Sequence, residues 1–214
     1  MREEVPAVGK SWREAVREAA HKAAIHEEET WRGGTGLAFN YRWEHVRAVV
    51  RLAVRLAERT GADREVVEAA AWLHDVAKGE SRDHGRDGAV LARRILAETD
   101  YPPDKVDAVA EAIAKHAGTT TPEPVEPLEA AVVWDADKLS KLGATVAIHG
   151  IGYRLQDGEG TTEGLIERSA GLEWQEQIVR SLNTAPARAA GWKRLEAARA
   201  FYRQAKAEFN GEDL

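Results

Sequence analysis

The 214-residue chain contains no cysteine, and this absence excludes several kinds of site at once. Disulfide bonds, thiolate zinc sites, iron–sulfur clusters and cysteine nucleophiles all need a thiol. A metal bound by this chain must therefore be held by imidazole and carboxylate groups, and the sequence has seven histidines and 36 acidic residues to supply them. The length predicts one domain with terminal extensions, or two small domains.

Long hydrophobic runs are also missing. Uninterrupted apolar stretches such as Ala69–Leu73 and Ala130–Trp134 are about five residues long, whereas a membrane-spanning helix needs about 20. The first ten residues lack the apolar segment and the small-residue cleavage site of a signal peptide. We therefore expect a cytoplasmic protein without a membrane partner.

A concentration of charge of one sign is absent as well. The 30 basic and 36 acidic residues are interleaved along the chain, and the net charge is −6. Proteins that bind the nucleic-acid backbone usually present a basic patch. We therefore expect no nucleic-acid partner.

Apolar residues recur at helical spacing through most of the chain, and strand signals are nearly absent. The sequence predicts an all-α fold, with helices over residues 11–29, 43–59, 63–78, 89–98, 104–116, 128–142, 165–182 and 186–209. Glycine, proline and polar residues predict loops at 32–36, 79–88, 118–127 and 150–164. The expected organisation is an N-terminal helix with a glycine-rich linker (1–40), a core (41–149), and a loop insertion with C-terminal helices packed on the core (150–214).

Four histidines lie on or in line with the apolar faces of these helices: His45, His74, His84 and His116. One such histidine alone is more often a core residue that is hydrogen-bonded to a backbone carbonyl. Four of them beside the carboxylate of Asp75 favour a metal centre. Nitrogen and oxygen ligands without sulfur suit Mn, Fe, Co, Ni or Mg, with Zn a less favoured alternative.

Two further aspartates interrupt the apolar segment 128–142 and are candidates for a second carboxylate ligand. Asp135 and Asp137 both lie over apolar neighbours at helical offsets, so periodicity does not choose between them. Asp75 directly follows His74, which places an anionic oxygen beside the ring and allows the carboxylate to bridge two cations.

The order and spacing of these residues resemble the HD-domain metal-dependent phosphohydrolases. His45, the doublet His74-Asp75 that follows 29 residues later, and Asp137 match the H…HD…D signature of that family. The family's alanine-aspartate-basic-leucine pattern matches ADKL at 136–139 and so selects Asp137 over Asp135. The resemblance covers roughly residues 41–148 and implies a bundle of about five core helices, to which this chain adds N- and C-terminal helices.

The resemblance also implies how the ligands divide. One divalent cation is expected on His45, His74, Asp75 and Asp137. Members of the family with a second metal have additional histidines at positions that His84 and His116 match, with Asp75 as the bridge. In a one-metal site these two histidines are expected to bind substrate instead.

One departure concerns a branch of the family that cleaves nucleoside triphosphates. Its members often have an aspartate after the last motif, where this chain has Ser140. The sequence therefore differs from that branch while retaining the signature of the superfamily.

Three basic residues lie one helical turn from a predicted ligand. Lys78 shares a face with His74 and Asp75 and is placed to contact a phosphoryl oxygen or to orient Asp75, or else only to favour the helix dipole. Arg42 precedes His45 by one turn and can grip a phosphate or form an exposed salt bridge. Lys141, one turn after its aspartate, allows the same two interpretations.

The remaining histidines are not predicted to be ligands. His21 and His26 lie among the acidic residues Glu27–Glu29 and are expected on a solvated face. His149 is placed to line the mouth of a pocket.

The function that these residues favour is hydrolysis of a phosphate ester or anhydride in a nucleotide or a similar small molecule. A cation lowers the pKa of its bound water to about 7, and two cations can clamp the attacking and leaving oxygens. Asp75 and Lys78 are the predicted catalytic residues; the predicted substrate-binding residues are Arg42, Lys78, His84 and His116.

Alternative functions are an HD-type di-iron oxygenase and a non-catalytic nucleotide-binding regulatory module, although no core ligand is missing. A homodimer formed by the amphipathic terminal helices is compatible with the sequence.

Overall fold

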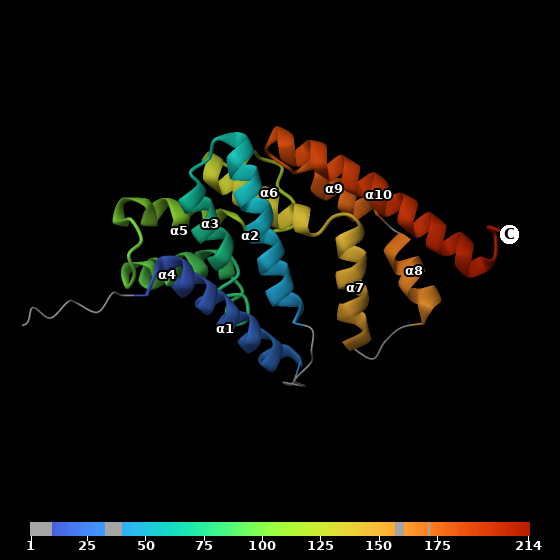
Figure 1. Cartoon of the computed structure of the whole chain (residues 1–214), viewed down its shortest axis with the longest axis horizontal. Helices are drawn as coiled ribbons and strands as arrows, with labels where there is room; N and C mark the ends of the chain where they lie inside the picture. The colour runs from blue at the N-terminus through green and yellow to red at the C-terminus, as the bar shows by residue number, and fades with distance from the viewer. Residues whose placement is uncertain (1–9, 33–39, 157–160, 171) are drawn as a thin grey trace, which may run out of the picture.

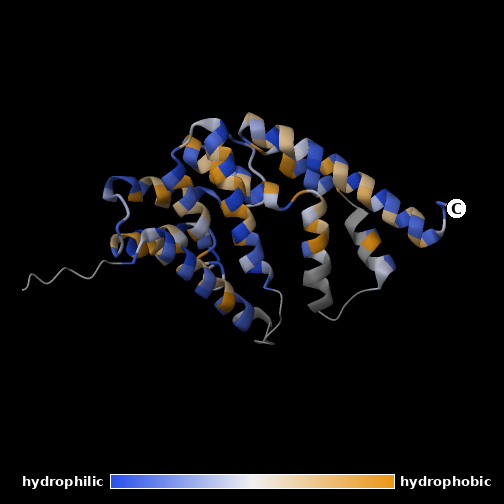
Figure 2. Ribbon diagram, viewed as in Figure 1, coloured by the Kyte–Doolittle hydropathy of each residue, from blue (hydrophilic) through white to orange (hydrophobic). Residues whose placement is uncertain are grey.

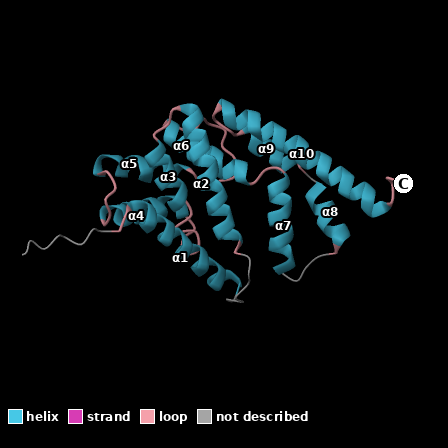
Figure 3. Ribbon diagram, viewed as in Figure 1, coloured by secondary structure: helices cyan, strands magenta, loops and turns pink. Residues whose placement is uncertain are grey.

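The computed structural model describes residues 10–32, 40–156, 161–170 and 172–214. These residues form ten α-helices and one short 3-10 helix, and they contain no strand (Figure 3). The helices are α1 (Trp12–Arg32), α2 (Tyr41–Thr60), α3 (Arg64–Leu73), α4 (His84–Ala97), η1 (Pro103–Lys105), α5 (Val106–Lys115), α6 (Leu128–Ser140), α7 (Ala144–Gln156), α8 (Thr162–Ala170), α9 (Glu173–Arg180) and α10 (Ala185–Asn210). The predicted all-α fold is confirmed. No helix of the described residues is both long enough and apolar enough to cross a membrane.

Helices α1 to α6 gather into a bundle at one side of the molecule, while α7, α8 and α10 lie at the other side (Figure 1). Helix α6 is the central element, since it packs against α2, α3 and α5 and also touches α9 and α10. Every residue of α6 from Ala130 to Ser140 is buried. The surrounding helices are amphipathic, and Figure 2 shows apolar and polar residues alternating along them. The core therefore surrounds the helix that carries both candidate aspartates.

Local capping explains where α2 and α3 begin and end. The side chain of Asn40 accepts a hydrogen bond from the backbone of Trp43 at 2.8 Å and so caps α2. Gly61 ends that helix in the left-handed conformation, with φ of 79°. Asp63 then caps α3 by accepting hydrogen bonds from two backbone N–H groups of its first turn, at 2.9 and 3.2 Å.

Helix α3 ends at Leu73, so the prediction that it reaches residue 78 is wrong. Beyond this point the backbone tightens into turns in which Val76 N–H donates to the carbonyl of Leu73 and Lys78 N–H to that of Asp75, both at 3.0 Å. On a continuous helix, neighbouring side chains diverge by about 100°. The tight turn instead leaves His74 and Asp75 facing the same cluster.

Helix α4 begins at His84, whereas the sequence predicted a loop as far as residue 88. The polar composition of the segment suggested the loop, but two of its glycines allow α4 to pack closely on α5. A Cβ added at Gly85 would lie 3.0 Å from the carbonyl oxygen of Ala114, and one added at Gly88 would lie 3.3 Å from Ile113 Cγ2. The glycines therefore serve helix packing, and His84 lies on the first turn of α4.

The C-terminal part differs from the prediction in two ways. Helix α7 continues to Gln156, so the segment 150–156 is helical and not a loop. The single helix predicted over 165–182 is two helices, α8 and α9, separated by the buried Leu172. The predicted glycine-rich linker at 33–36 and residues 157–160 of the predicted insertion lie outside the described residues.

Candidate metal centre

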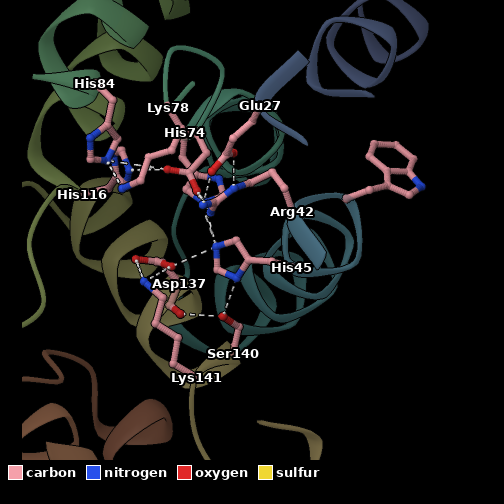
Figure 4. Close-up of polar contacts among 12 residues, drawn as sticks. Glu27, Arg42, His45, His74, Lys78, His84, His116, Asp137, Ser140 and Lys141 are labelled. Atoms are coloured by element: carbon pink, nitrogen blue, oxygen red, sulfur yellow. Dashed lines mark hydrogen bonds and ion pairs between the residues drawn. The ribbon is translucent and has the colours of Figure 1, made fainter. Parts of the chain in front are cut away.

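The structure brings all six predicted metal ligands together inside the bundle (Figure 4). They come from five different helices or helix ends. The ligands are His45 of α2, His74 and Asp75 at the end of α3, His84 at the start of α4, His116 at the end of α5, and Asp137 of α6. All are buried except His84, which is half-buried.

Asp75 lies between two pairs of histidines. Its Oδ2 is 3.7 Å from Nε2 of His45 and 3.5 Å from Nε2 of His74. Its Oδ1 is 3.6 Å from Nε2 of His84 and 3.4 Å from Nε2 of His116. Each pair together with Asp75 forms a group in which the ligand atoms lie within 4.8 Å of one another. The carboxylate is thus shared by two adjacent candidate sites.

Two of the rings are fixed by backbone carbonyl groups of their own helices. Nδ1–H of His74 donates to the carbonyl of Ala71 at 2.8 Å. Nδ1–H of His116 donates to the carbonyl of Ile113 at 2.6 Å. A neutral ring that donates through Nδ1 has its lone pair on Nε2, the atom that faces Asp75.

A serine fixes the third ring in the same way. Ser140 Oγ donates to the carbonyl of Asp137 at 2.7 Å, so it accepts a hydrogen bond from Nδ1–H of His45 at 3.1 Å. The lone pair of His45 is therefore also on Nε2, which lies 3.3 Å from Nε2 of His74. The Nε2 atoms of His45 and His74, neither of which carries a proton, therefore face each other.

Asp137 presents one oxygen to the same place. Its Oδ2 accepts hydrogen bonds from Lys138 Nζ at 2.5 Å and Lys141 Nζ at 3.0 Å. Its Oδ1 is buried and lies 3.2 Å from Nε2 of His45 and 2.9 Å from Lys141 Nζ, and within the described part of the chain it accepts no hydrogen bond of ordinary geometry. A buried carboxylate oxygen and imidazole nitrogens that lack a proton, gathered at one place, are atoms that bind a cation, so this cluster fits a divalent metal ion.

The protonation states of these residues also suit a bound metal ion. Burial keeps the pKa of His45 below its usual value and lowers that of His74 to about 3, so both rings are neutral near pH 7. Burial raises the pKa of Asp75, but the neighbouring His74 and Arg42 outweigh it and leave the pKa well below its usual range. The cluster therefore offers neutral nitrogens and ionised oxygens, the forms that bind metals.

Arg42 contacts two carboxylates. Its Nη1 donates to Asp75 Oδ2 at 2.5 Å, and its Nε and Nη2 donate to the two oxygens of Glu27 at 2.6 and 2.8 Å. His21 and His26 of the same helix are exposed, as predicted, whereas Glu27 is partly buried. The predicted role of Arg42 in holding phosphate stays a prediction, with its donors directed to Asp75 and Glu27.

A cavity of about 140 Å³ opens beside the cluster. Its lining residues are Tyr41, Arg42, Asp75, Lys78, His84, His116, Ala117, Gly118, Asp137 and Lys141. Lys78 reaches it from the turn after α3, and its Nζ lies 3.0 Å from His84 Nε2. Burial and this ammonium group lower the pKa of His84 to about 4. The three basic residues singled out by the sequence therefore meet at one cavity.

The other candidate aspartate points away from the cluster. Asp135 Oδ1 accepts a hydrogen bond from the backbone N–H of Asn183, and its Oδ2 accepts from the backbone and hydroxyl of Thr184, all at 2.7 Å. Asp135 thus ties α6 to the start of α10, and the geometry places Asp137 in the candidate centre.

Comparison with known proteins agrees with this architecture. The family model for the HD domain matches residues 42–142. These residues form an HD domain, which places the chain in the HD superfamily. The HD match begins at Arg42, ends just after Lys141 and includes all six predicted ligands, whereas Glu27 lies outside it.

Two curated proteins resemble this HD chain in sequence. The bifunctional uridylyltransferase/uridylyl-removing enzyme of Bradyrhizobium diazoefficiens is 32% identical over 169 residues. The protein of the same name from Rhodopseudomonas palustris is 30% identical over 169 residues. In both cases the alignment covers 71% of this chain but only 17% of the relative.

Solved structures share the HD fold over almost the whole chain. Bacillus subtilis YpgQ in complex with ADP has a TM-score of 0.66 at 21% identity, and the match covers 92% of this chain and 97% of YpgQ. An HD-superfamily hydrolase of Bacillus thuringiensis has a TM-score of 0.59 at 22% identity, and that match covers 91% of this chain and 98% of the other.

Four residues around the HD centre were not among the predicted site residues: Glu27, Tyr41, Lys138 and Ser140. Tyr41 precedes His45 by one helical turn and stacks on its ring, with the ring centroids 6.1 Å apart. Projection of α2 would have found it. Lys138 is fully buried and donates to the carbonyl of His116 at 3.0 Å. Such contacts between helices have no signal in the sequence.

Proposed function

We propose that this protein is a metal-dependent phosphohydrolase that cleaves a phosphate ester or anhydride in a nucleotide or a similar small molecule. The observation that carries the proposal is the position of Asp75, whose two oxygens face two separate pairs of imidazole nitrogens. The names of similar proteins support a nucleotide, since YpgQ binds ADP and the curated relatives are uridylyl-removing enzymes.

In the proposed site, His45, His74, Asp75 and Asp137 hold one divalent cation, and Asp75, His84 and His116 hold a second. Mn, Fe, Co, Ni or Mg are the proposed ions, because the ligands are nitrogen and oxygen atoms without sulfur. When bound, such ions lower the pKa of water and neutralise charge that develops on phosphoryl oxygens.

The basic side chains at the cavity complete the proposal. Lys78 and Lys141 line the cavity with their ammonium groups beside His84 and Asp137. An ammonium group placed there can bind a phosphoryl oxygen and stabilise its charge as the bond to the leaving group breaks. These cations favour an anionic substrate.

The size of the cavity limits which part of the substrate enters. Pockets that enclose whole small ligands measure about 300–1,000 Å³, whereas this cavity measures about 140 Å³. A phosphoryl group fits this volume, and a nucleoside does not. We therefore propose that the nucleoside part lies outside the cavity.

A substrate panel tests the proposal. The purified protein is incubated with nucleoside mono-, di- and triphosphates in the presence of Mn²⁺, Mg²⁺, Co²⁺ or Ni²⁺, and phosphate and pyrophosphate are measured separately. Metal-dependent release of either product supports hydrolysis. Substrate-dependent oxygen consumption by iron-loaded protein without release of either product would instead support the oxygenase.

Variants of the ligands identify the site. We expect Asp75→Ala to abolish metal binding and hydrolysis while the circular dichroism spectrum stays helical, because the bundle packs through its apolar faces. His116→Ala is expected to reduce the metal content from two ions to one. Full metal content in Asp75→Ala would refute the ligand assignment, and unchanged stoichiometry in His116→Ala would favour a one-metal site.

A further inference from the structure

The N-terminal helix contributes a side chain to the candidate centre from outside the matched HD domain. Glu27 of α1 accepts two hydrogen bonds from Arg42, at 2.6 and 2.8 Å, and Arg42 donates in turn to Asp75 Oδ2 at 2.5 Å (Figure 4). The side chains become progressively less exposed along this series, at 21% for Glu27, 18% for Arg42 and 5% for Asp75. The series therefore leads from the edge of the bundle to the bridging carboxylate.

The fold holds α1 in the position that this series needs. Gly79 follows the turn after α3, and a Cβ added to it would lie 3.1 Å from the Cα of Glu27. Asn40, which caps α2, donates from its amide to the carbonyl of Ala24 at 3.0 Å. The backbone of α1 is thus fixed against both elements next to the centre, and the approach of Glu27 depends on a residue without a side chain.

The two contacts of Arg42 determine its orientation. A guanidinium group bound to a carboxylate through Nε and Nη2 directs its Nη1 to one side in a fixed plane. Here that direction meets Asp75 Oδ2. Each Asp75 oxygen also faces a pair of imidazoles, so a small rotation of the carboxylate would remove one oxygen from its pair.

We propose that Glu27 is a positioning residue of the metal centre, which holds Arg42 so that its Nη1 fixes Asp75 in the bridging orientation. The negative charge of Glu27 also offsets the positive charge of Arg42, which otherwise lies beside the cations that Asp75 binds. This inference rests on the metal binding of the proposed function, and it does not depend on which bond is hydrolysed.

The first test compares Glu27→Gln with the matched control Glu29→Gln, which removes the same charge from an exposed position on the same helix. Mn²⁺ binding to the EDTA-treated protein is measured by titration calorimetry, and the melting temperature is measured without metal. Loss of an outer partner of a metal ligand typically weakens metal binding 10- to 100-fold. We expect Glu27→Gln to weaken Mn²⁺ binding about tenfold, more than its fall in metal-free melting temperature accounts for, with no effect of Glu29→Gln on either measurement.

The second test asks whether Glu27 acts through Arg42. We expect Arg42→Gln to weaken Mn²⁺ binding at least as much, and Glu27→Gln to add nothing in the double variant, because residues in one network are not additive. Arg42→Lys retains the charge without the planar fork and is expected to bind no better than Arg42→Gln.

Other outcomes would overturn the proposal. If Glu27→Gln lowers only the metal-free melting temperature, Glu27 is a structural residue of α1. If the variants raise KM for the substrate and leave Mn²⁺ affinity unchanged, Arg42 binds substrate and Glu27 serves that role. A wild-type protein that binds no Mn²⁺ would contradict the metal site itself, whereas one that binds Mn²⁺ without hydrolysing phosphate esters still permits this test.

Discussion

At the scale of single residues, the centre depends on how each imidazole ring is oriented. His74 and His116 are fixed by carbonyl groups three residues earlier in the chain, whereas His45 is fixed by the hydroxyl of Ser140 on another helix. A carbonyl can only accept a hydrogen bond, so it specifies the ring tautomer by itself. A hydroxyl specifies it only because its own proton is engaged, here with the carbonyl of Asp137.

The role of Ser140 in orienting the ring of His45 can therefore be tested. In Ser140→Ala, Nδ1 of His45 loses its partner, and the proton is no longer confined to that nitrogen. We expect Mn²⁺ affinity to fall about tenfold, in the range seen for outer partners of metal ligands. Calorimetric titration of the EDTA-treated protein provides the measurement.

Ser181→Ala is the matched control for this variant. Ser181 also ends a helix and donates to the carbonyl three residues earlier, at 2.9 Å, but it lies away from the centre. The control loses a hydrogen bond of the same kind at the end of a helix and should retain its Mn²⁺ affinity. Equal affinities in the two variants would show that the hydroxyl of Ser140 does not orient His45.

The sequence predicted the ligand cluster better than the residues around it. Imidazoles on apolar faces are recognisable because a polar ring there needs a partner, and all six predicted ligands lie together. Ser140 and Glu27 act through contacts with residues 95 and 15 positions away. Helix periodicity says nothing about such partners, since it describes one element at a time.

At the scale of elements, α6 uses two aspartates two residues apart for opposite tasks. Residues at this spacing lie about 200° apart around a helix. Asp137 therefore faces the histidines, while Asp135 faces the start of α10 and accepts hydrogen bonds from Asn183 and Thr184. Both aspartates are buried, so burial alone does not distinguish the ligand from the structural residue.

Substitution by asparagine should separate these tasks. Asp135→Asn places an amide against N–H donors and is expected to lower the free energy of unfolding by about 2 kcal/mol, within the range for a buried charged hydrogen-bonding group. Its metal content should be unchanged. Asp137→Asn is expected to reduce the metal content and also to destabilise the metal-free protein, because it leaves the buried Lys138 without its carboxylate partner. Urea denaturation and metal analysis of both variants measure the two effects, and a loss of metal in Asp135→Asn would contradict the division.

The start of α4 shows where element prediction failed and why. Gly85 and Gly88 resemble loop residues in the sequence, but in the structure they let α4 lie close to α5. That closeness places His84 beside His116, with their ring centroids 5.1 Å apart. The sequence shows the glycines, but it does not show which helix packs against them.

Two glycine-to-alanine variants test this explanation. Alanine is favoured over glycine in a helix by about 1 kcal/mol, so Gly150→Ala in α7, where the added Cβ meets no atom within 4 Å, should stabilise the protein. Gly85→Ala is expected to destabilise it by about 1–2 kcal/mol, because the Cβ would lie 3.0 Å from a carbonyl oxygen and 3.2 Å from Ala117 Cβ. Urea denaturation measures the change in the free energy of unfolding for each variant. Stabilisation by Gly85→Ala would show that α4 does not need this close packing.

At the scale of the whole molecule, the all-α fold follows from amphipathic periodicity, but the relation between bundle and terminal helices does not. The divisions at residues 40 and 149 stay predictions, as does the homodimer. Large apolar side chains are exposed on α9 and α10, including Trp174, Trp192 and Phe201. Nothing in the periodicity of a helix says whether such residues meet a neighbouring helix or a second chain.

Burial of neutral histidines also affects the stability of the whole bundle, and the size of this effect depends on pH. The pKa of His74 is lowered by burial from its ordinary value of 6.5 to about 3, and burial lowers the pKa of His45 in the same direction. The unfolded chain therefore binds more protons than the folded chain between these values. Stability must then fall as pH falls below about 6.5.

Asp75 and Asp137 have a linkage of the same sign in a lower pH window. Their pKa values are held well below the ordinary 3.8, Asp75 by His74 and Arg42 and Asp137 by Lys141 and Lys138, against the opposing effect of burial. They stabilise the fold above that pH, and their contribution is lost only in stronger acid. Between pH 6 and 4.5 the histidines therefore dominate the change.

Urea denaturation of the EDTA-treated protein at pH values from 8.5 to 4.5 tests this balance. One histidine that is charged when unfolded and neutral when folded changes the free energy of unfolding by about 1.4 kcal/mol per pH unit. We expect a nearly flat profile above pH 7.5 and a fall of at least that slope below pH 6, since His45 and His74 add in the same direction. Bound Mn²⁺ should add stability at pH 7.5 and lose its effect toward pH 5, because protons then compete for the ligands. A metal-free protein equally stable at pH 7.5 and 4.5 would mean that these rings are not held neutral in the fold.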